Sequence, residues 1–195
     1  MSLPLDNLKN PKALSRFIGT CAVGLVIDLW TKHAAVERLK ESRDVIEFIP
    51  GWLHFEYTEN HGAVFGIGQG QWLLFVVVSV FAIGLLTYLF TTGSKKPLPQ
   101  MVLGMLLAGV LGNMYDRVSY SYVRDMIHAL PGWVNPLRGL FPSWQYVFPW
   151  IFNIADVMLC TGVGLTLVLG LFHKPPSDEP TETAAQPSPL QRDAT

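Results

Sequence analysis

The sequence predicts an all-α membrane protein with four transmembrane helices and a small β-sheet patch outside the membrane. Half of its 195 residues are hydrophobic, and its mean hydropathy is +0.31. These apolar residues gather in long runs, which is typical of membrane spans. Two polar and aromatic segments and one short turn, at residues 91–97, separate the runs. We therefore expect one membrane domain over residues 1–174, followed by a proline-rich disordered tail over residues 175–195.

The four spans are predicted from the length and composition of the apolar runs. The first runs from residue 14 to 30, and we interpret it as an uncleaved helix because no small-residue cleavage site closes it. The second covers residues 71–90 and the third residues 98–115. The fourth begins at Pro149 and runs to about residue 172, which puts Asp156 about two turns inside it. Small residues that favour close helix packing lie along the third span: Gly104, Ala108, Gly109 and Gly112.

The segments between the spans contain less regular elements. Residues 34–43 carry charges at helical spacing and predict a short surface helix. Residues 44–59 are rich in β-branched and aromatic side chains, and a Pro50-Gly51 turn divides them, so a small hairpin is expected there. Residues 118–126 predict a short extended stretch, with Asp125 as a loop residue. The prolines and aromatics of residues 127–148 favour an irregular interfacial segment.

The distribution of basic residues predicts the orientation. Four spans put both termini on one side, and the fourteen Lys and Arg residues divide equally between the two sides. Those on the terminal side are crowded into short segments near the membrane, which favours cytoplasmic termini. Asp28, Asn60, Asp116 and Asp156 then all lie near the outer leaflet boundary.

Two Asn-x-x-Asp segments suggest a chemistry for this convergence. On a helix, Asn113 and Asp116 share one face, as do Asn153 and Asp156. Two neighbouring carboxyl groups share a proton, so one can activate water while the other donates to a carbonyl. We therefore predict Asp116 and Asp156 as a catalytic pair. The two asparagines would orient the carboxyls, and Arg117 would hold a substrate carbonyl or a lipid phosphate.

Other interpretations of these residues stay open. Asp116 alone would more often be an interfacial or capping residue, and Asp28 can simply pair with Lys32 one turn later. A proton channel or small transporter that uses Asp116 and Asp156 as a relay is the main alternative function. A third is a non-enzymatic membrane assembly factor. The net charge of −1 gives no nucleic-acid footprint, and the scattered histidines predict neither a metal site nor a cofactor.

Five motifs resemble those of the lipoprotein signal peptidases, also called signal peptidase II, in order and spacing. The resemblance covers about residues 14–172, with departures at Leu29, Val64 and Met126 and a longer stretch at 128–150. The motifs are Asp28-Leu29-Trp30-Thr31-Lys32, Glu59-Asn60-His61-Gly62-Ala63-Val64-Phe65-Gly66, Gly112-Asn113-Met114-Tyr115-Asp116-Arg117, Val123-Arg124-Asp125 and Phe152-Asn153-Ile154-Ala155-Asp156.

The resemblance implies an aspartyl endopeptidase of the bacterial inner membrane, with its active site near the periplasmic leaflet. Its substrate would be a prolipoprotein cleaved just before a diacylglyceryl-modified cysteine, and its partners would be this substrate and membrane lipids. The resemblance leaves the oligomeric state open, and a monomer is compatible with it. The family's small periplasmic sheet and short periplasmic helix would correspond to residues 33–66 and part of 117–148. The implied catalytic residues are Asp116 and Asp156, and the implied binding or supporting residues are Asp28, Lys32, Asn60, Gly62, Asn113, Arg117 and Asn153.

Overall fold

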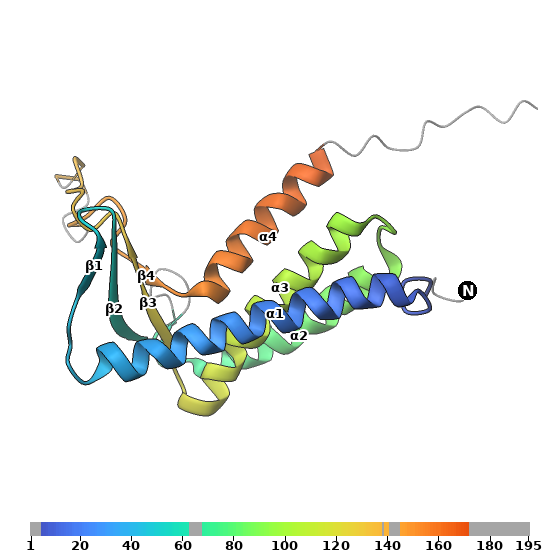
Figure 1. The fold of residues 1–195 in the computed structure, drawn as a ribbon, viewed down its shortest axis with the longest axis horizontal. Coiled ribbons are helices and arrows are strands. Elements are labelled where there is room, and N and C mark those ends of the chain that lie inside the picture. The colour runs from blue at the N-terminus through green and yellow to red at the C-terminus, as the bar shows by residue number, and fades with distance from the viewer. Residues whose placement is uncertain (1–4, 63–67, 138, 141–144, 172–195) are drawn as a thin grey trace, which may run out of the picture.

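The fold combines four helices with a small sheet across one end of them (Figure 1). The structure is a computed structural model that describes residues 5–62, 68–137, 139–140 and 145–171. The predicted tail at 175–195 lies outside these residues. The helices are α1 (Pro11–Ala35), α2 (Trp72–Thr92), α3 (Pro97–Tyr120) and α4 (Ile154–Leu171), and one π-helical turn, η1 (Val36–Lys40), continues α1.

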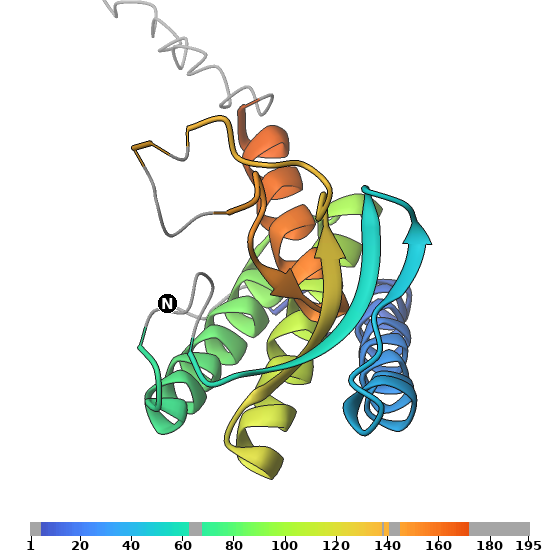
Figure 2. The same cartoon turned by 90° about the vertical axis from the view of Figure 1, so that its left-hand side faces the viewer.

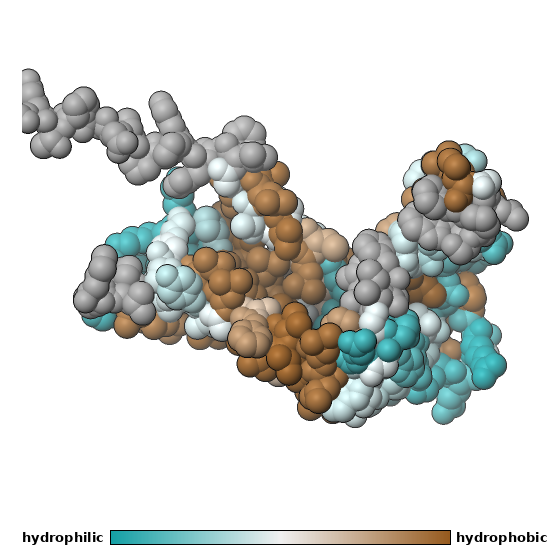
Figure 3. Space-filling model, turned by 180° about the vertical axis from the view of Figure 1, so that it is seen from behind, coloured by the Kyte–Doolittle hydropathy of each residue, from teal (hydrophilic) through white to brown (hydrophobic). Residues whose placement is uncertain are grey.

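Three helices of the described chain are long and apolar enough to cross a membrane, namely α1 with η1, α2 and α3. The fourth apolar helix, α4, is shorter, so the structure supports three of the four predicted spans by length and composition. Seen from behind, apolar side chains cover the middle of the helices, and hydrophilic residues gather toward the end that carries the sheet (Figure 3). This distribution fits helices that face lipid along most of their length.

The central helix is α3, which packs against α1, α2 and α4. Small residues make this packing close, as the sequence predicts. A Cβ atom at Gly109 would lie 2.7 Å from the carbonyl oxygen of Ala155 and 2.8 Å from Leu159 Cγ. A Cβ atom at Gly112 would overlap the carboxylate of Asp28. The absence of side chains at these two positions therefore lets the other helices approach the functional end of α3.

The sheet is antiparallel, with strand order β1-β2-β3-β4. Its strands are β1 (Ile46–Ile49), β2 (Leu53–Asn60), β3 (Val123–Ala129) and β4 (Ile151–Phe152). Gly51, with φ of +74°, turns the chain between β1 and β2, so the predicted hairpin is confirmed. A register shift between Phe55 and Thr58 places a bulge in β2 just before Thr58 pairs with Asp125. Viewed from the end of the molecule that carries the sheet, the strands cross in front of the helix ends (Figure 2).

Several sequence predictions need correction. Ser121, with φ of +67°, ends α3 and donates its N–H to the Arg117 carbonyl. Residues 118–120 of the segment predicted as extended are therefore the last turn of a helix, whereas residues 123–126 lie in β3 and are extended as predicted. Asp125 belongs to β3, so it is not a loop residue. Asp156 lies in the first turn of α4, because β4 occupies the start of the predicted span. The predicted surface helix at 34–43 continues α1 as η1, and no separate short helix is present in the described part of the chain.

Candidate active site

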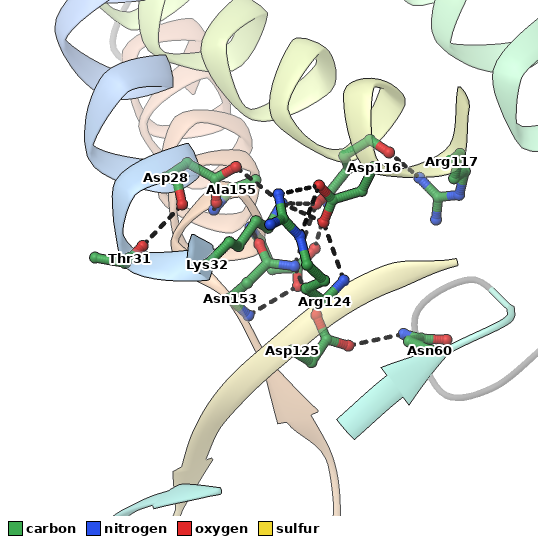
Figure 4. A network of polar contacts seen from close by, with 12 residues as sticks. Asp28, Thr31, Lys32, Asn60, Asp116, Arg117, Arg124, Asp125, Asn153 and Ala155 are labelled. Carbon is green, nitrogen blue, oxygen red and sulfur yellow. Dashed lines mark hydrogen bonds and ion pairs between the residues drawn. The ribbon is translucent and has the colours of Figure 1, made fainter. Parts of the chain in front are cut away.

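A cluster of buried polar and charged residues lies where α1, α3, β3 and the start of α4 meet under the sheet (Figure 4). Asp28, Lys32, Asp116 and Asn153 have no exposed surface, and Asp125 is 1% exposed. Charged groups removed from water in this way are costly unless each is paired or hydrogen-bonded. The partners of each side chain therefore indicate what the cluster can do.

Asp28 joins α1 to the beginning of α4. Its Oδ2 atom lies 2.8 Å from Lys32 Nζ, one helical turn further on, so the predicted pairing is observed. Its Oδ1 atom accepts a 2.8 Å hydrogen bond from the backbone N–H of Ala155. That N–H belongs to the first turn of α4, where backbone donors have no partner within the helix. Asp28 thus fixes the end of the helix that carries Asp156, in the space that Gly112 leaves open.

Asp116 is surrounded by cations and a backbone donor. Its Oδ1 atom accepts hydrogen bonds from Arg124 Nη2 at 2.7 Å and Arg124 Nε at 3.1 Å. Its Oδ2 atom accepts from the backbone N–H of Arg124 at 3.0 Å and lies 3.4 Å from Lys32 Nζ. These charge-assisted contacts stabilise an ionised carboxylate and tie the end of α3 to the start of β3.

Asp125 lies in a different environment, among amides. Its Oδ2 atom accepts a hydrogen bond from Asn60 Nδ2 at 3.0 Å, and its Oδ1 atom accepts one from Asn153 Nδ2 at 2.6 Å. Burial and the neighbouring charge of Asp156 raise the pKa of Asp125 to about 7, although these two amides act in the opposite direction. Asp125 therefore exchanges a proton near neutral pH, as an acid–base catalyst requires.

Asp156 is held by two asparagines and is partly accessible. Asn113 Nδ2 donates to its Oδ1 atom at 2.9 Å, and the backbone N–H of Asn153 donates to its Oδ2 atom at 3.1 Å. The Oδ1 atom of Asn153 accepts from the backbone N–H of Asp156 at 3.0 Å, so Asn153 caps α4. Because Asn153 also donates to Asp125, this one asparagine links the two carboxyl groups.

The remaining predicted residues complete the network. Asn113 Oδ1 accepts from Lys32 Nζ at 2.9 Å and from Asn153 Nδ2 at 3.2 Å. Arg117 donates to the carbonyl of Gly62 at 3.2 Å, and its guanidinium lies 5.0 Å from the centre of the Phe75 ring. Asn60 Oδ1 accepts from the backbone N–H of Gly62 at 3.0 Å. Arg117 and Asn60 thus hold the chain that leaves β2 against the site.

The structure brings all nine predicted site residues together and adds two more, Arg124 and Asp125. Asp156 shares its asparagine partner with Asp125, whereas Asp116 is occupied by Arg124 and Lys32. The geometry therefore favours Asp125 over Asp116 as the proton-sharing partner of Asp156. The signal for this was present in the Val123-Arg124-Asp125 motif, but an Asp in a stretch interpreted as a loop gave no reason to expect burial. In the described chain, no three His, Cys, Asp or Glu side chains are arranged to hold a metal ion.

Comparisons with known proteins point to one family. Residues 20–172 match the family model described as signal peptidase (SPase) II. The lipoprotein signal peptidase of Symbiobacterium thermophilum is 35% identical over 144 residues, which cover 73% of this chain and 86% of the relative. That of Clostridium acetobutylicum is 33% identical, covering 77% of this chain and 88% of the relative. A solved bacterial membrane enzyme is 30% identical with a TM-score of 0.66, covering 80% of this chain and 93% of that structure. A second has a TM-score of 0.63 at the same identity, with 79% and 86% covered.

Proposed function

From the premise that the chain belongs to the signal peptidase II family, a family of peptidases that process lipoprotein signal peptides, we propose that it is an aspartyl endopeptidase with Asp125 and Asp156 as its catalytic pair. The substrate is a prolipoprotein with a diacylglyceryl-modified cysteine, and cleavage occurs just before that cysteine. The observation that carries the assignment is that Asn153 contacts both carboxyl residues. Its Nδ2 atom donates to Asp125, its Oδ1 atom accepts from the backbone N–H of Asp156, and its own backbone N–H donates to the Asp156 carboxylate.

The balance of charge in the cluster supports a shared proton. Its carboxyl groups are Asp28, Asp116, Asp125 and Asp156, and its cations are Lys32, Arg117 and Arg124. Asp28 and Asp116 are directly paired with cations, and Arg117 lies within electrostatic range of Asp156. One carboxyl group is left without a matching cation, and a proton neutralises it at least cost in a buried site. Asp125, whose pKa is raised to about 7, is the group that takes this proton.

The two environments assign a role to each member of the pair. Asp156 accepts two hydrogen bonds, which stabilise its carboxylate, and it is partly accessible, so it removes a proton from the attacking water. Asp125 donates its proton to the oxygen of the scissile carbonyl as the tetrahedral intermediate forms. When the intermediate breaks down, Asp156 gives its proton to the leaving amine of the modified cysteine. Asp125 takes its own proton back as the carbonyl reforms, so the pair returns to its starting state.

The membrane supplies much of the substrate positioning in this proposal. We propose that α4 is a fourth span, that both termini are cytoplasmic and that the sheet lies on the periplasmic side of the bacterial inner membrane. The diacylglyceryl chains then lie in the outer leaflet, where each buried CH₂ group adds about 0.8 kcal/mol to the free energy of membrane binding. A reporter active only in the periplasm, fused within the turn at Gly51 or after Thr195, tests this orientation. Activity at Thr195 would contradict it.

The test of the catalytic pair is cleavage of a diacylglyceryl-modified prolipopeptide by purified variants. We expect Asp125→Asn and Asp156→Asn each to reduce the cleavage rate by roughly 10³-fold, because each removes one proton-transfer step. Asp116→Asn should retain far more activity, since Asp116 acts as an anchor. If Asp116 and Asp156 were the catalytic pair, as predicted from the sequence, Asp116→Asn would lose most of its activity and Asp125→Asn would retain far more. Near wild-type cleavage by Asp125→Asn would overturn our assignment.

A further inference from the structure

Arg124 precedes Asp125 on β3 and points into the cluster, toward Asp116 (Figure 4). It is 5% exposed, and its guanidinium stacks over the ring of Tyr120 at 4.7 Å. Through its Nη2, Nε and backbone N atoms it makes three hydrogen bonds to the two carboxylate oxygens of Asp116. This contact connects one neighbour of Asp125 in the chain directly to α3, and it supplies one of the three cations of the cluster.

We propose that Arg124 is a positioning residue that, through Asp116, sets the charge of the cluster so that the pair of Asp125 and Asp156 holds one proton at neutral pH. The inference rests on the proposed catalytic pair. It assigns Asp116 and Arg124 a joint role: together they anchor β3 and add no net charge, so they leave the single excess carboxyl group to the catalytic pair.

The charged and titratable groups that face this contact lie on α1 and α3. Lys32 of α1 lies 3.4 Å from Asp116 and also pairs with Asp28, and Arg117 of α3 interacts electrostatically with Asp116. The side chains of Tyr115 and Tyr120 on α3 interact electrostatically with Arg124. Hydrogen bonds and the charge of Asp116 outweigh the opposing effect of burial and hold the pKa of Arg124 above its usual value. Arg124 therefore stays cationic throughout the pH range of any cleavage assay.

Removal of each charge should shift the pH–rate profile in a predictable direction. Without Arg124, Asp116 keeps the Lys32 ammonium and the backbone N–H of residue 124 as partners, and the cluster loses one of its three cations. The catalytic pair then binds protons more tightly, and the bell-shaped pH–rate profile moves to higher pH. Without the charge of Asp116, the cluster loses its excess carboxylate, and the profile moves to lower pH. Removal of both charges restores the original balance.

The experiment is the pH dependence of prolipopeptide cleavage between about pH 5 and 9 for the full chain and three variants. We expect Arg124→Met to shift the profile up by about one pH unit, Asp116→Asn to shift it down by a similar amount, and the double variant to return close to the wild-type position. The maximal rate of the double variant stays reduced, because the anchor is lost. Arg124→Lys, which keeps the charge, should keep the wild-type profile.

Lys95→Met, at an exposed ion pair near the opposite end of α3, is the matched control for loss of one cation and should not move the profile. Unfolding midpoints in the same detergent separate loss of stability from a change in protonation. If Arg124→Met does not fold, Asp116→Asn alone still tests the sign of the shift. Profiles that keep the wild-type position in both single variants would overturn this inference while leaving the catalytic pair intact. A wrong assignment of the catalytic pair is detected separately, because Asp125→Asn would then keep full activity.

Discussion

The two ends of α3 each hold a buried polar cluster, and the two clusters are built from different chemistry. At one end, Asn7 and Gln100 are almost fully buried and contribute neutral amide side chains. Asn7 Nδ2 donates to the carbonyl of Phe90 at 2.7 Å, and Gln100 Nε2 donates to Asn7 Oδ1 at 3.2 Å. Arg16 donates to Gln100 Oε1 at 3.2 Å. This cluster ties the N-terminal segment to the turn between α2 and α3.

At the other end, the buried cluster combines carboxylates with cations and leaves one carboxyl group in excess. Neutral amides satisfy backbone groups and need no proton, so the first cluster has a single charge state at all working pH values. The second cluster changes its protonation near neutral pH through Asp125. The comparison indicates that burial alone does not mark the functional site. The functional site is marked by the burial of a titratable group whose charge is not matched by a neighbouring cation.

The largest effect outside the catalytic pair should come from Gly112→Ala, which damages the charged cluster without changing any charge. The added Cβ atom would overlap the carboxylate of Asp28 and would meet Ala155 Cβ at 3.6 Å. Asp28 must then move from the N–H of Ala155, and the start of α4 moves with it. We expect roughly 10²-fold slower prolipopeptide cleavage, because misplacement of a catalytic group by about 1 Å has this effect.

Gly84→Ala is the matched control for this change. It is the same substitution in α2, at a position where nothing lies within 4 Å of the new Cβ atom. Cleavage should be unchanged, and the unfolding temperature should stay level or rise slightly, since Ala has the higher helix propensity. Equal activity in Gly84→Ala and Gly112→Ala would show that Asp28 does not position α4.

Much of the fold was predictable because it depends on local patterns. The apolar runs predicted the helices, and Pro50-Gly51 predicted the turn between β1 and β2. The boundaries were less accurate where helix and strand meet. Residues 118–120 are rich in β-formers, yet they are exposed and form the last turn of α3, which the left-handed conformation of Ser121 ends.

The choice between Asp116 and Asp125 was beyond the sequence for a physical reason. Both residues are almost fully buried. They differ only in their partners, which are Arg124 and Lys32 for one and Asn60 and Asn153 for the other. These partners come from segments far apart in the chain, so no local spacing reveals them. The order of the spans predicted that Asp28, Asn60, Asp116 and Asp156 converge. The three-dimensional arrangement adds Asp125 and distinguishes its role from that of Asp116.

A smaller effect, on stability alone, is expected from damage to the neutral cluster. Asn7→Ala removes the donor to the Phe90 carbonyl and one acceptor of Gln100, whose Nε2 then keeps only the Ser94 carbonyl. The expected loss in the free energy of unfolding is about 1–3 kcal/mol. Chemical denaturation in detergent measures this loss. The cleavage rate of the folded fraction, and its pH profile, should match the wild type. A shifted pH profile would contradict the contrast between the two clusters.

The smallest effect should come from the exposed pair of Asp6 and Lys95, which lies beside the neutral cluster. The two side chains approach to 2.8 Å but remain 60% and 73% exposed. The hydrogen bond and the charge of Lys95 lower the pKa of Asp6, so the contribution of this pair is present above the ordinary aspartate pKa and is lost as the pH falls through the lowered value. Water and salt screen such a contact. Lys95→Met should therefore leave the unfolding midpoint unchanged within error at pH 7, and a loss as large as that of Asn7→Ala would mean that surface charge, rather than the buried amides, holds this end of α3.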